Sequence, residues 1–163
     1  MKEKVLKLLE GKTVHSIGRT GSMLWIGFGQ QIWVKDHEEN LIEKPQIELN
    51  LQCPWRIRKN NNILLASNDI FEPNTKIKKG EVFEWEEKGT SCFDTKIEEL
   101  DLNRSNMKVT QVKISKTEEI KIYLSEGNLL ETFIDTSTGK ECWRIIDWGI
   151  SGKSIISPGL REE

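Results

Sequence analysis

Two nearly identical triplets, Trp55-Arg56-Ile57 and Trp143-Arg144-Ile145, carry the side chains best suited to ligand binding. The planar guanidinium of arginine forms paired hydrogen bonds with carboxylates and phosphates. If the triplets occupy equivalent places around a two-fold axis, the two arginines converge into an anion clamp. The alternative is that each arginine pairs with a nearby carboxylate or stacks on a tryptophan. The amide of Gln52 and the carboxylates of Asp69 and Asp94 could complete such a site. The candidate ligand-binding residues are therefore Gln52, Arg56, Arg144, Asp69 and Asp94.

The cysteines and histidines are the other residues that could do chemistry. A cysteine nucleophile requires a base and an orienting group, but no spacing ties Cys92, in GTSCFD, to His15. The three cysteines and two histidines also lack the paired spacing of a zinc site. No Ser-His-Asp order, phosphate-binding glycine loop or HExxH motif occurs. The sequence therefore predicts no catalytic residue, no metal site and no cofactor.

The stretch IELNLQCPWRIR positions the first triplet. Apolar and polar side chains alternate without a break from Ile47 to Ile57, which predicts a half-buried strand. Because Trp55 shares its face with apolar residues only, it is predicted to lie in the core, with Arg56 on the opposite face. Pro54 has no backbone donor and predicts a strand edge or a bulge. Trp25, Trp33 and Trp85 are predicted to be buried as well.

The triplets end two similar β-rich stretches, 13–57 and 108–145. The matched apolar positions are Val14, Ile17, Leu24, Ile26 and Phe28 with Val109, Val112, Ile120, Ile122 and Leu124. A glycine and an apolar run follow in each stretch, at 32–34 and at 129–133. The first stretch is longer by roughly the charged segment 35–44. The likeness predicts either a duplicated four-strand antiparallel meander, joined by a connector at 58–107, or a chance similarity of β-rich sequences.

Helices are predicted at the N-terminus and in the connector. An apolar stripe in the first nine residues ends at Gly11, and Asp94 is placed to cap a helix that ends at Asn103. The tail after Gly149 is rich in Ser, Gly and Pro and is predicted to be loosely held. The expected fold class is α+β and mainly antiparallel β, with the duplicated meanders forming a sandwich or an open barrel in one domain, 1–163.

Composition narrows the classes of partner. The chain of 163 residues has a net charge of −2, so no excess of basic residues favours nucleic acid as a partner. No apolar stretch approaches the ~20 residues of a membrane span. The start of the chain is too polar for a signal peptide, and an odd number of cysteines is typical of reduced thiols. We therefore expect a cytoplasmic protein that binds neither nucleic acid nor membrane.

Five segments resemble a family of uncharacterised bacterial proteins. They are LNLQCPWRI, ILLASNDIFEP, FEWEEKGTSCFDTKIEEL, GNLLETFID and ECWRII. The family pattern pairs an "LHxQCPWRI"-like strand with a C-terminal "WRxF"-like strand, and the likeness runs from about Val14 to Ile146. This sequence has Asn50 in place of the histidine and Ile146 in place of the phenylalanine. The resemblance implies a soluble bacterial cytoplasmic protein, without a particular activity, and the departure at Asn50 weakens the case for histidine chemistry on that strand.

Two classes of function fit these observations. The first is a non-enzymatic protein-binding module, such as an immunity protein that blocks a toxin, because small bacterial families of this kind often have that role. The alternative is a small-anion or metabolite-binding protein, or an enzyme, that uses the arginine-lined face with Gln52. We favour the first class because the chain offers no catalytic constellation and few groups that titrate near neutral pH.

Overall fold

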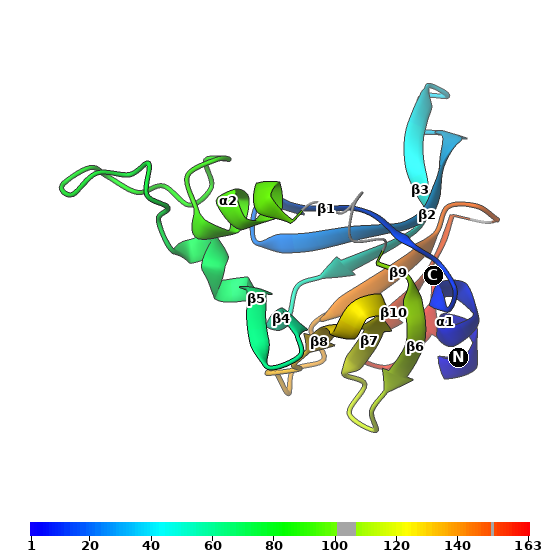
Figure 1. The fold of residues 1–163 in the computed structure, drawn as a ribbon. Coiled ribbons are helices and arrows are strands. Elements are labelled where there is room, and N and C mark those ends of the chain that lie inside the picture. The colour runs from blue at the N-terminus through cyan, green and yellow to red at the C-terminus, as the bar shows by residue number, and fades with distance from the viewer. Residues whose placement is uncertain (101–106, 151) are drawn as a thin grey trace.

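The computed structural model describes residues 1–100, 107–150 and 152–163. These residues form two antiparallel sheets with an N-terminal and a central helix (Figure 1), which confirms the predicted fold class. The six-stranded sheet contains, in spatial order, β1 (Val14–Thr20), β2 (Met23–Lys35), β3 (Leu41–Leu51), β9 (Trp143–Asp147), β10 (Lys153–Ser157) and β11 (Arg161–Glu162). The five-stranded sheet contains β5 (Asn62–Ala66), β4 (Trp55–Lys59), β8 (Asn128–Thr132), β7 (Ile120–Leu124) and β6 (Val109–Ile114).

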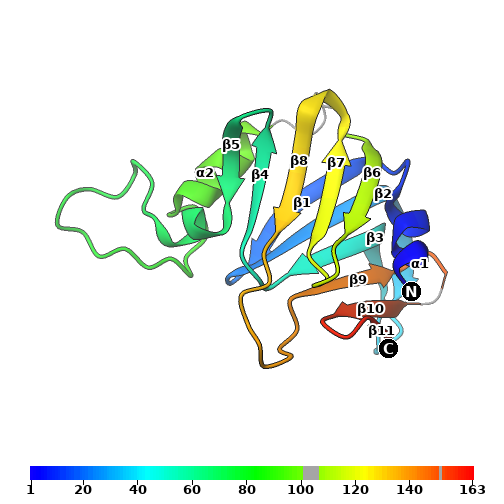
Figure 2. The same ribbon diagram turned by 90° about the horizontal axis from the view of Figure 1, so that it is seen from below.

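The core lies between the two sheets, which cross each other at an angle (Figure 2). Both triplet tryptophans belong to it, because Trp55 is 2% exposed and Trp143 is fully buried. Strand alternation then directs Arg56 and Arg144 to the outer faces of their sheets. The predicted burial of Trp55 is thus confirmed.

In the described residues, two α-helices and two short 3-10 helices accompany the sheets. Helix α1 (Lys2–Leu9) covers one end of the core with Val5 and Leu9, as its apolar stripe predicts. Helix α2 (Cys92–Glu99) begins with Ser91, not Asp94, as its N-cap residue. Asp94 takes the third helical position of a capping box, where its carboxylate accepts from the Ser91 N–H. The predicted helix end at Asn103 lies outside the described residues. The 3-10 helices are η1 (Ser67–Phe71) and η2 (Ser125–Gly127).

The alternating stretch around Trp55 is two strands and not one. β3 ends at Leu51 in the six-stranded sheet, and β4 begins at Trp55 in the five-stranded sheet. Residues 52–54 carry the chain from one sheet to the other, and Pro54, which has no N–H to donate, lies in this crossing. The period-two pattern survives because both strands turn the same set of positions toward the shared core.

The two halves of the chain have the same strand order. β1, β2 and β3 are neighbours in one sheet, and β6, β7 and β8 are neighbours in the other. The fourth strand of each half, β4 or β9, leaves its own meander and pairs with the third strand of the other half. The last strands, β5 and β10, then pair with β4 and β9. Each sheet is therefore completed by strands from the opposite half.

Reciprocal backbone hydrogen bonds join the halves at equivalent positions. The Val14 N–H donates to the Met107 carbonyl, and the Val109 N–H donates to the Lys12 carbonyl, each at 2.8 Å. At the crossing, the Gln52 N–H donates to Cys142 and the Phe133 N–H donates to Pro54, again at 2.8 Å. A register shift follows the first valine in both β1 and β6. The halves therefore match in register as well as in strand order.

The register also corrects the alignment of the third strands. The run 129–133 corresponds to 48–52, because Leu51 is the strand partner of Trp143 and Thr132 is the strand partner of Trp55. The run 32–34 has no counterpart. It belongs to a hairpin extension, residues 29–46, which takes the place of the short link 125–127 in the second half. We call this extension the arm; its tip bends away from the sheets (Figure 1).

The C-terminal tail is not loosely held, contrary to the sequence-based expectation. β10 pairs with β9 over five residues, and Ile155 and Ile156 are buried. The serines that suggested a loop, Ser154 and Ser157, are buried within this strand. The composition of the tail gave the wrong prediction because this strand is stabilised by pairing with β9 and not by its own β propensity.

Candidate binding surface

Arg56 lies in a charge cluster on the outer face of the five-stranded sheet. Its Nε donates to Glu131 Oε2 at 2.8 Å, and the Nε of Arg58 donates to the same oxygen at 3.1 Å. Lys121 Nζ lies 3.4 Å from the other oxygen. Burial alone would raise the pKa of Glu131, but the hydrogen bonds from the two arginines outweigh it, and the pKa is lowered. One buried carboxylate thus holds three cations.

Arg144 has a separate set of partners. Its guanidinium binds both carboxylate oxygens of Glu141, at 3.0 and 2.9 Å, and lies 3.7 Å from Glu163. Gln52 Nε2 donates to the same Glu141 at 3.4 Å. The structure therefore brings two of the predicted site residues, Gln52 and Arg144, onto one carboxylate.

Arg56 and Arg144 do not share a ligand-sized space. They lie on the outer faces of different sheets, and the core that contains Trp55 and Trp143 separates those faces. Each has a carboxylate partner of its own, Glu131 or Glu141. Equivalent positions in the two halves therefore place the arginines on opposite sides of the molecule and not in one clamp.

Asp69 and Asp94 organise the connector. Asp94 binds Arg19 through two hydrogen bonds of 2.9 and 3.0 Å, and the Arg19 side chain is 2% exposed. Burial alone would raise the pKa of Asp94, but hydrogen bonds from Arg19 and Ser91 lower it well below its usual range. Asp69 accepts from the Ala66 N–H and from Lys96. Both carboxylates are occupied by contacts that hold α2 and η1 against the sheets.

The thiols of Cys53 and Cys142 lie together where the chain crosses between the sheets. They line a pocket of about 430 Å³ to which four of the five resemblance segments contribute, through Gln52, Ser67, Asp135 and Glu141 among others. Burial raises the pKa of the Cys53 thiol to about 12, and burial also raises that of Cys142. Both thiols are therefore protonated at neutral pH and are poor nucleophiles.

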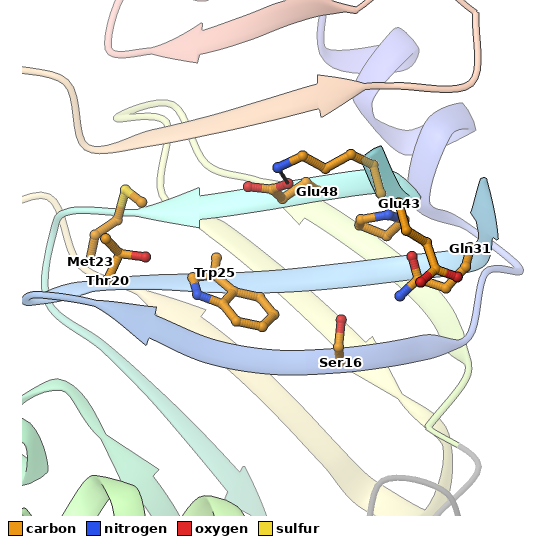
Figure 3. Close-up of a pocket in the computed structure, with 9 residues that line it drawn as sticks. Ser16, Thr20, Met23, Trp25, Gln31, Glu43 and Glu48 are labelled. Atoms are coloured by element: carbon orange, nitrogen blue, oxygen red, sulfur yellow. Dashed lines mark ion pairs between the residues drawn. The ribbon is translucent and has the colours of Figure 1, made fainter. Parts of the chain in front are cut away.

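A second pocket, of about 340 Å³, opens on the outer face of the six-stranded sheet (Figure 3). We call it the sheet pocket. Strands β1 and β2 contribute Ser16, Thr20, Met23 and Trp25, and the arm contributes Gln31, Glu43, Lys44 and Pro45. Glu48 of β3 also lines it and accepts from the Trp148 indole N–H at 3.1 Å. The pocket thus lies where the base of the arm meets the outer face of the sheet.

Two glycines shape the floor of the sheet pocket. The six-membered ring of Trp25 lies across Gly18 of β1, in the space that a side chain would fill. At Gly27, an added Cβ would lie 2.9 Å from the Cβ of Pro45. The absence of these side chains lets the indole lie along the sheet and lets the arm approach it.

The arm carries exposed apolar side chains, which the sequence reasoning missed. Trp33, predicted to be buried, is 67% exposed, and Leu41 is 63% exposed. Trp33 is directly opposite Glu43 in the hairpin, so both project from the same face, and Leu41 follows on that face. The sequence did contain a signal, because Trp33 shares its strand face with the polar Gln31 and Lys35, two positions away on either side. The exposed face of the arm is continuous with the sheet pocket.

The exposure of Trp25 and Trp85 lies between that of the buried Trp55 and that of the exposed Trp33. Trp25 is half-buried in the sheet pocket, and Trp85 packs partly against the core, edge-on to Phe71.

Within the described ranges, no group of three or more His, Cys, Asp or Glu side chains could hold a metal ion.

Comparison with known proteins adds no assignment. No family model, curated protein or solved structure matches the chain. The resemblance to the bacterial family with the "LHxQCPWRI"-like strand therefore stays a prediction. In the part of the chain that the structure describes, no helix combines the length and the apolar character needed to cross a membrane.

Proposed function

We propose that the protein is a non-enzymatic binding module that holds a partner protein on the arm and the sheet pocket. The observation that carries this proposal is the exposure of Trp33 and Leu41 on one face of a hairpin extension. Tryptophan supplies a large contact area and is enriched among the residues that dominate binding energy. Side chains of this kind, left in water beside a pocket, are typical of an interaction surface.

The second half of the chain supports this interpretation. Its equivalent hairpin closes with η2 and has no arm, yet its strands pair in the same order. The scaffold therefore does not require the extension. Because apolar exposure on an edge hairpin promotes unwanted association, its presence is best explained by a partner that covers it.

A toxin that the protein neutralises is the partner class we favour within this proposal. The family resemblance and a cytoplasmic location, which we also propose on the basis of the free cysteines, support it. The check is gene order: a toxin gene next to this gene is expected, followed by co-purification of the two products. If the gene never neighbours a toxin gene, the immunity role is rejected while a different protein partner remains testable.

The direct experiment compares two surface changes of similar chemistry. The partner is captured by the wild-type chain with cross-linking, identified by mass spectrometry, and its dissociation constant is measured. A Trp33→Ala/Leu41→Ala variant is expected to bind at least tenfold more weakly. A Val82→Ala variant serves as the control, since Val82 is 81% exposed but lies in the connector. Equal binding by the arm variant would contradict the proposal, as would a dimer of this chain formed through the arm.

A second candidate function is the binding of a small anion or metabolite at Arg56. Only its Nε takes part in the contact with Glu131, and its side chain is 39% exposed, which leaves the terminal nitrogens for a ligand. Three cations around one carboxylate make this face net positive. Inorganic phosphate should then raise the melting temperature of the wild type and not of Arg56→Ala. The same shift in both would remove Arg56 from consideration.

A further inference from the structure

The sheet pocket contains hydrogen-bond acceptors that no donor of the described residues satisfies. Gln31 Oε1 is buried and has no partner within 1–100, 107–150 and 152–163, although its amide nitrogen contacts His15 Nδ1 at 3.3 Å. The Glu43 carboxylate lines the same pocket and takes part in no ion pair among the described residues. Figure 3 shows Gln31 and Glu43 close together at one end of the pocket, beyond Ser16. A buried acceptor without a donor is costly, so this end is suited to a ligand that donates.

The charge of the pocket favours a cation. Glu43 and Glu48 contribute two carboxylates, and Lys44 contributes one ammonium, which leaves one net negative charge. Lys44 Nζ lies 3.9 Å from Glu48 and 5.1 Å from the Trp148 ring centroid, so it is directed to Glu48 and not to Glu43. The unneutralised carboxylate is therefore at the arm end, beside the unsatisfied amide oxygen.

The aromatic wall favours a planar cation. The indole of Trp25 lies along the sheet because Gly18 has no side chain, and it borders the space between the acceptors and Met23 (Figure 3). A guanidinium stacks on such a ring and still donates from its edge to acceptors on more than one side. An ammonium is a compact point charge that lacks this planar edge.

We propose that the sheet pocket holds an arginine side chain of the partner protein, stacked on Trp25 and donating to Glu43 and Gln31. This inference rests on the proposed function for its source of arginine. The partner segment then places apolar side chains on Trp33 and Leu41, which lie on the arm face that continues from the pocket. The partner surface is expected to be basic and apolar, complementary to this end of the molecule.

The test uses the whole protein and a small probe, N-acetyl-arginine amide, followed by the indole and side-chain amide signals in nitrogen-15 correlation spectra. The probe should shift the Trp25 indole and the Gln31 amide signals in a saturable way. The citrulline analogue, which has the same shape without the charge, should bind at least tenfold more weakly. Glu43→Gln should weaken the probe at least threefold, whereas Glu126→Gln, in the equivalent link of the second half, should not.

Several results would overturn the inference. Equal binding of the citrulline analogue would exclude charge recognition, and equal binding of N-acetyl-lysine amide would exclude guanidinium selection. Tighter binding of free arginine than of its blocked amide would indicate a metabolite and not a protein side chain. Because the probe needs no partner, its failure leaves the effect of Trp33→Ala/Leu41→Ala on partner binding intact. Conversely, probe binding without capture of a partner would reject the proposed function and the protein source of the arginine, but not guanidinium recognition by the pocket.

Discussion

The β2–β3 and β7–β8 hairpins hold equivalent places in the two halves, yet only β2–β3 extends into an arm. The three-residue η2 is enough to connect β7 to β8. In the first half, residues 29–46 replace that link and expose Trp33 and Leu41. The comparison separates what the scaffold needs from what is added to it, and it locates the added material next to the sheet pocket.

The outer sheet faces beside these two hairpins also differ, in how fully their polar side chains are paired. The equivalent rows are Lys121–Glu131–Arg56 on the five-stranded sheet and Trp25–Asn50–Arg144 on the six-stranded sheet. The central Glu131 binds both of its row neighbours, whereas the central Asn50 has a buried Oδ1 without a partner in the described part of the chain. The first row stabilises its sheet through internal pairing. The second leaves the Asn50 amide oxygen without a partner among the described residues, next to Trp25, which lines the sheet pocket.

The largest expected effect separates the two central residues. Glu131→Gln removes the charge that holds three cations and should lower the free energy of unfolding by about 2 kcal/mol, less than for a fully buried pair because the cations reach solvent. Asn50→Ala removes an amide whose oxygen has no partner and should cost less than about 1 kcal/mol. Urea denaturation of both variants checks this. Equal losses would contradict the contrast between the rows.

Acid should weaken the protein through the same carboxylate. The pKa of Glu131 is lowered in the folded state, so its contribution is present above the unfolded pKa of about 4.3 and is lost as pH falls through the folded pKa. Asp94 acts in the same direction. The free energy of unfolding, measured from pH 7 down to pH 3, should fall less steeply for Glu131→Gln than for the wild type. Parallel curves would remove Glu131 from the acid response.

A smaller difference is expected between the two triplet tryptophans. The Trp143 indole N–H donates to the Glu118 carbonyl at 2.8 Å, whereas the Trp55 indole N–H is buried and none of the described residues accepts from it. Phenylalanine at either position loses ring area, but only Trp143→Phe also loses a hydrogen bond. Trp143→Phe should therefore destabilise by about 1 kcal/mol more than Trp55→Phe. Thermal unfolding of the pair measures the difference, and a larger loss at Trp55 would contradict it.

The smallest effect on stability is expected at the arm. Trp33→Ala removes an exposed side chain and should change the free energy of unfolding by less than about 0.5 kcal/mol. Replacement of residues 29–46 by the Ser-Glu-Gly link of the second half should likewise leave a folded protein with the same strand pairing. Circular dichroism and chemical denaturation check both. Unfolding on either change would show that the arm belongs to the scaffold.

The sequence alone determined which faces the strands around Trp55 present. The alternation around Trp55 placed that residue in the core and Arg56 outside, because successive side chains of a strand point to opposite faces. The equivalent positions of β1, β2, β6 and β7 were also readable, since apolar spacing follows the same local geometry. The N-terminal helix followed from its apolar stripe in the same way, whereas Asp94 located the central helix but is its third residue and not its N-cap.

Only the tertiary structure decided where the alternating stretch divides and which partners the arginines have. The crossing at residues 52–54 depends on which strands β3 and β4 meet, and a period-two pattern is the same on both sides of it. Arg56 pairs with Glu131, 75 positions away, because the two residues are opposite each other in β4 and β8. Long-range strand pairing thus determines which side chains meet. Trp33 stays in solvent because the tip of the arm bends away from the sheets and has no second layer to pack against.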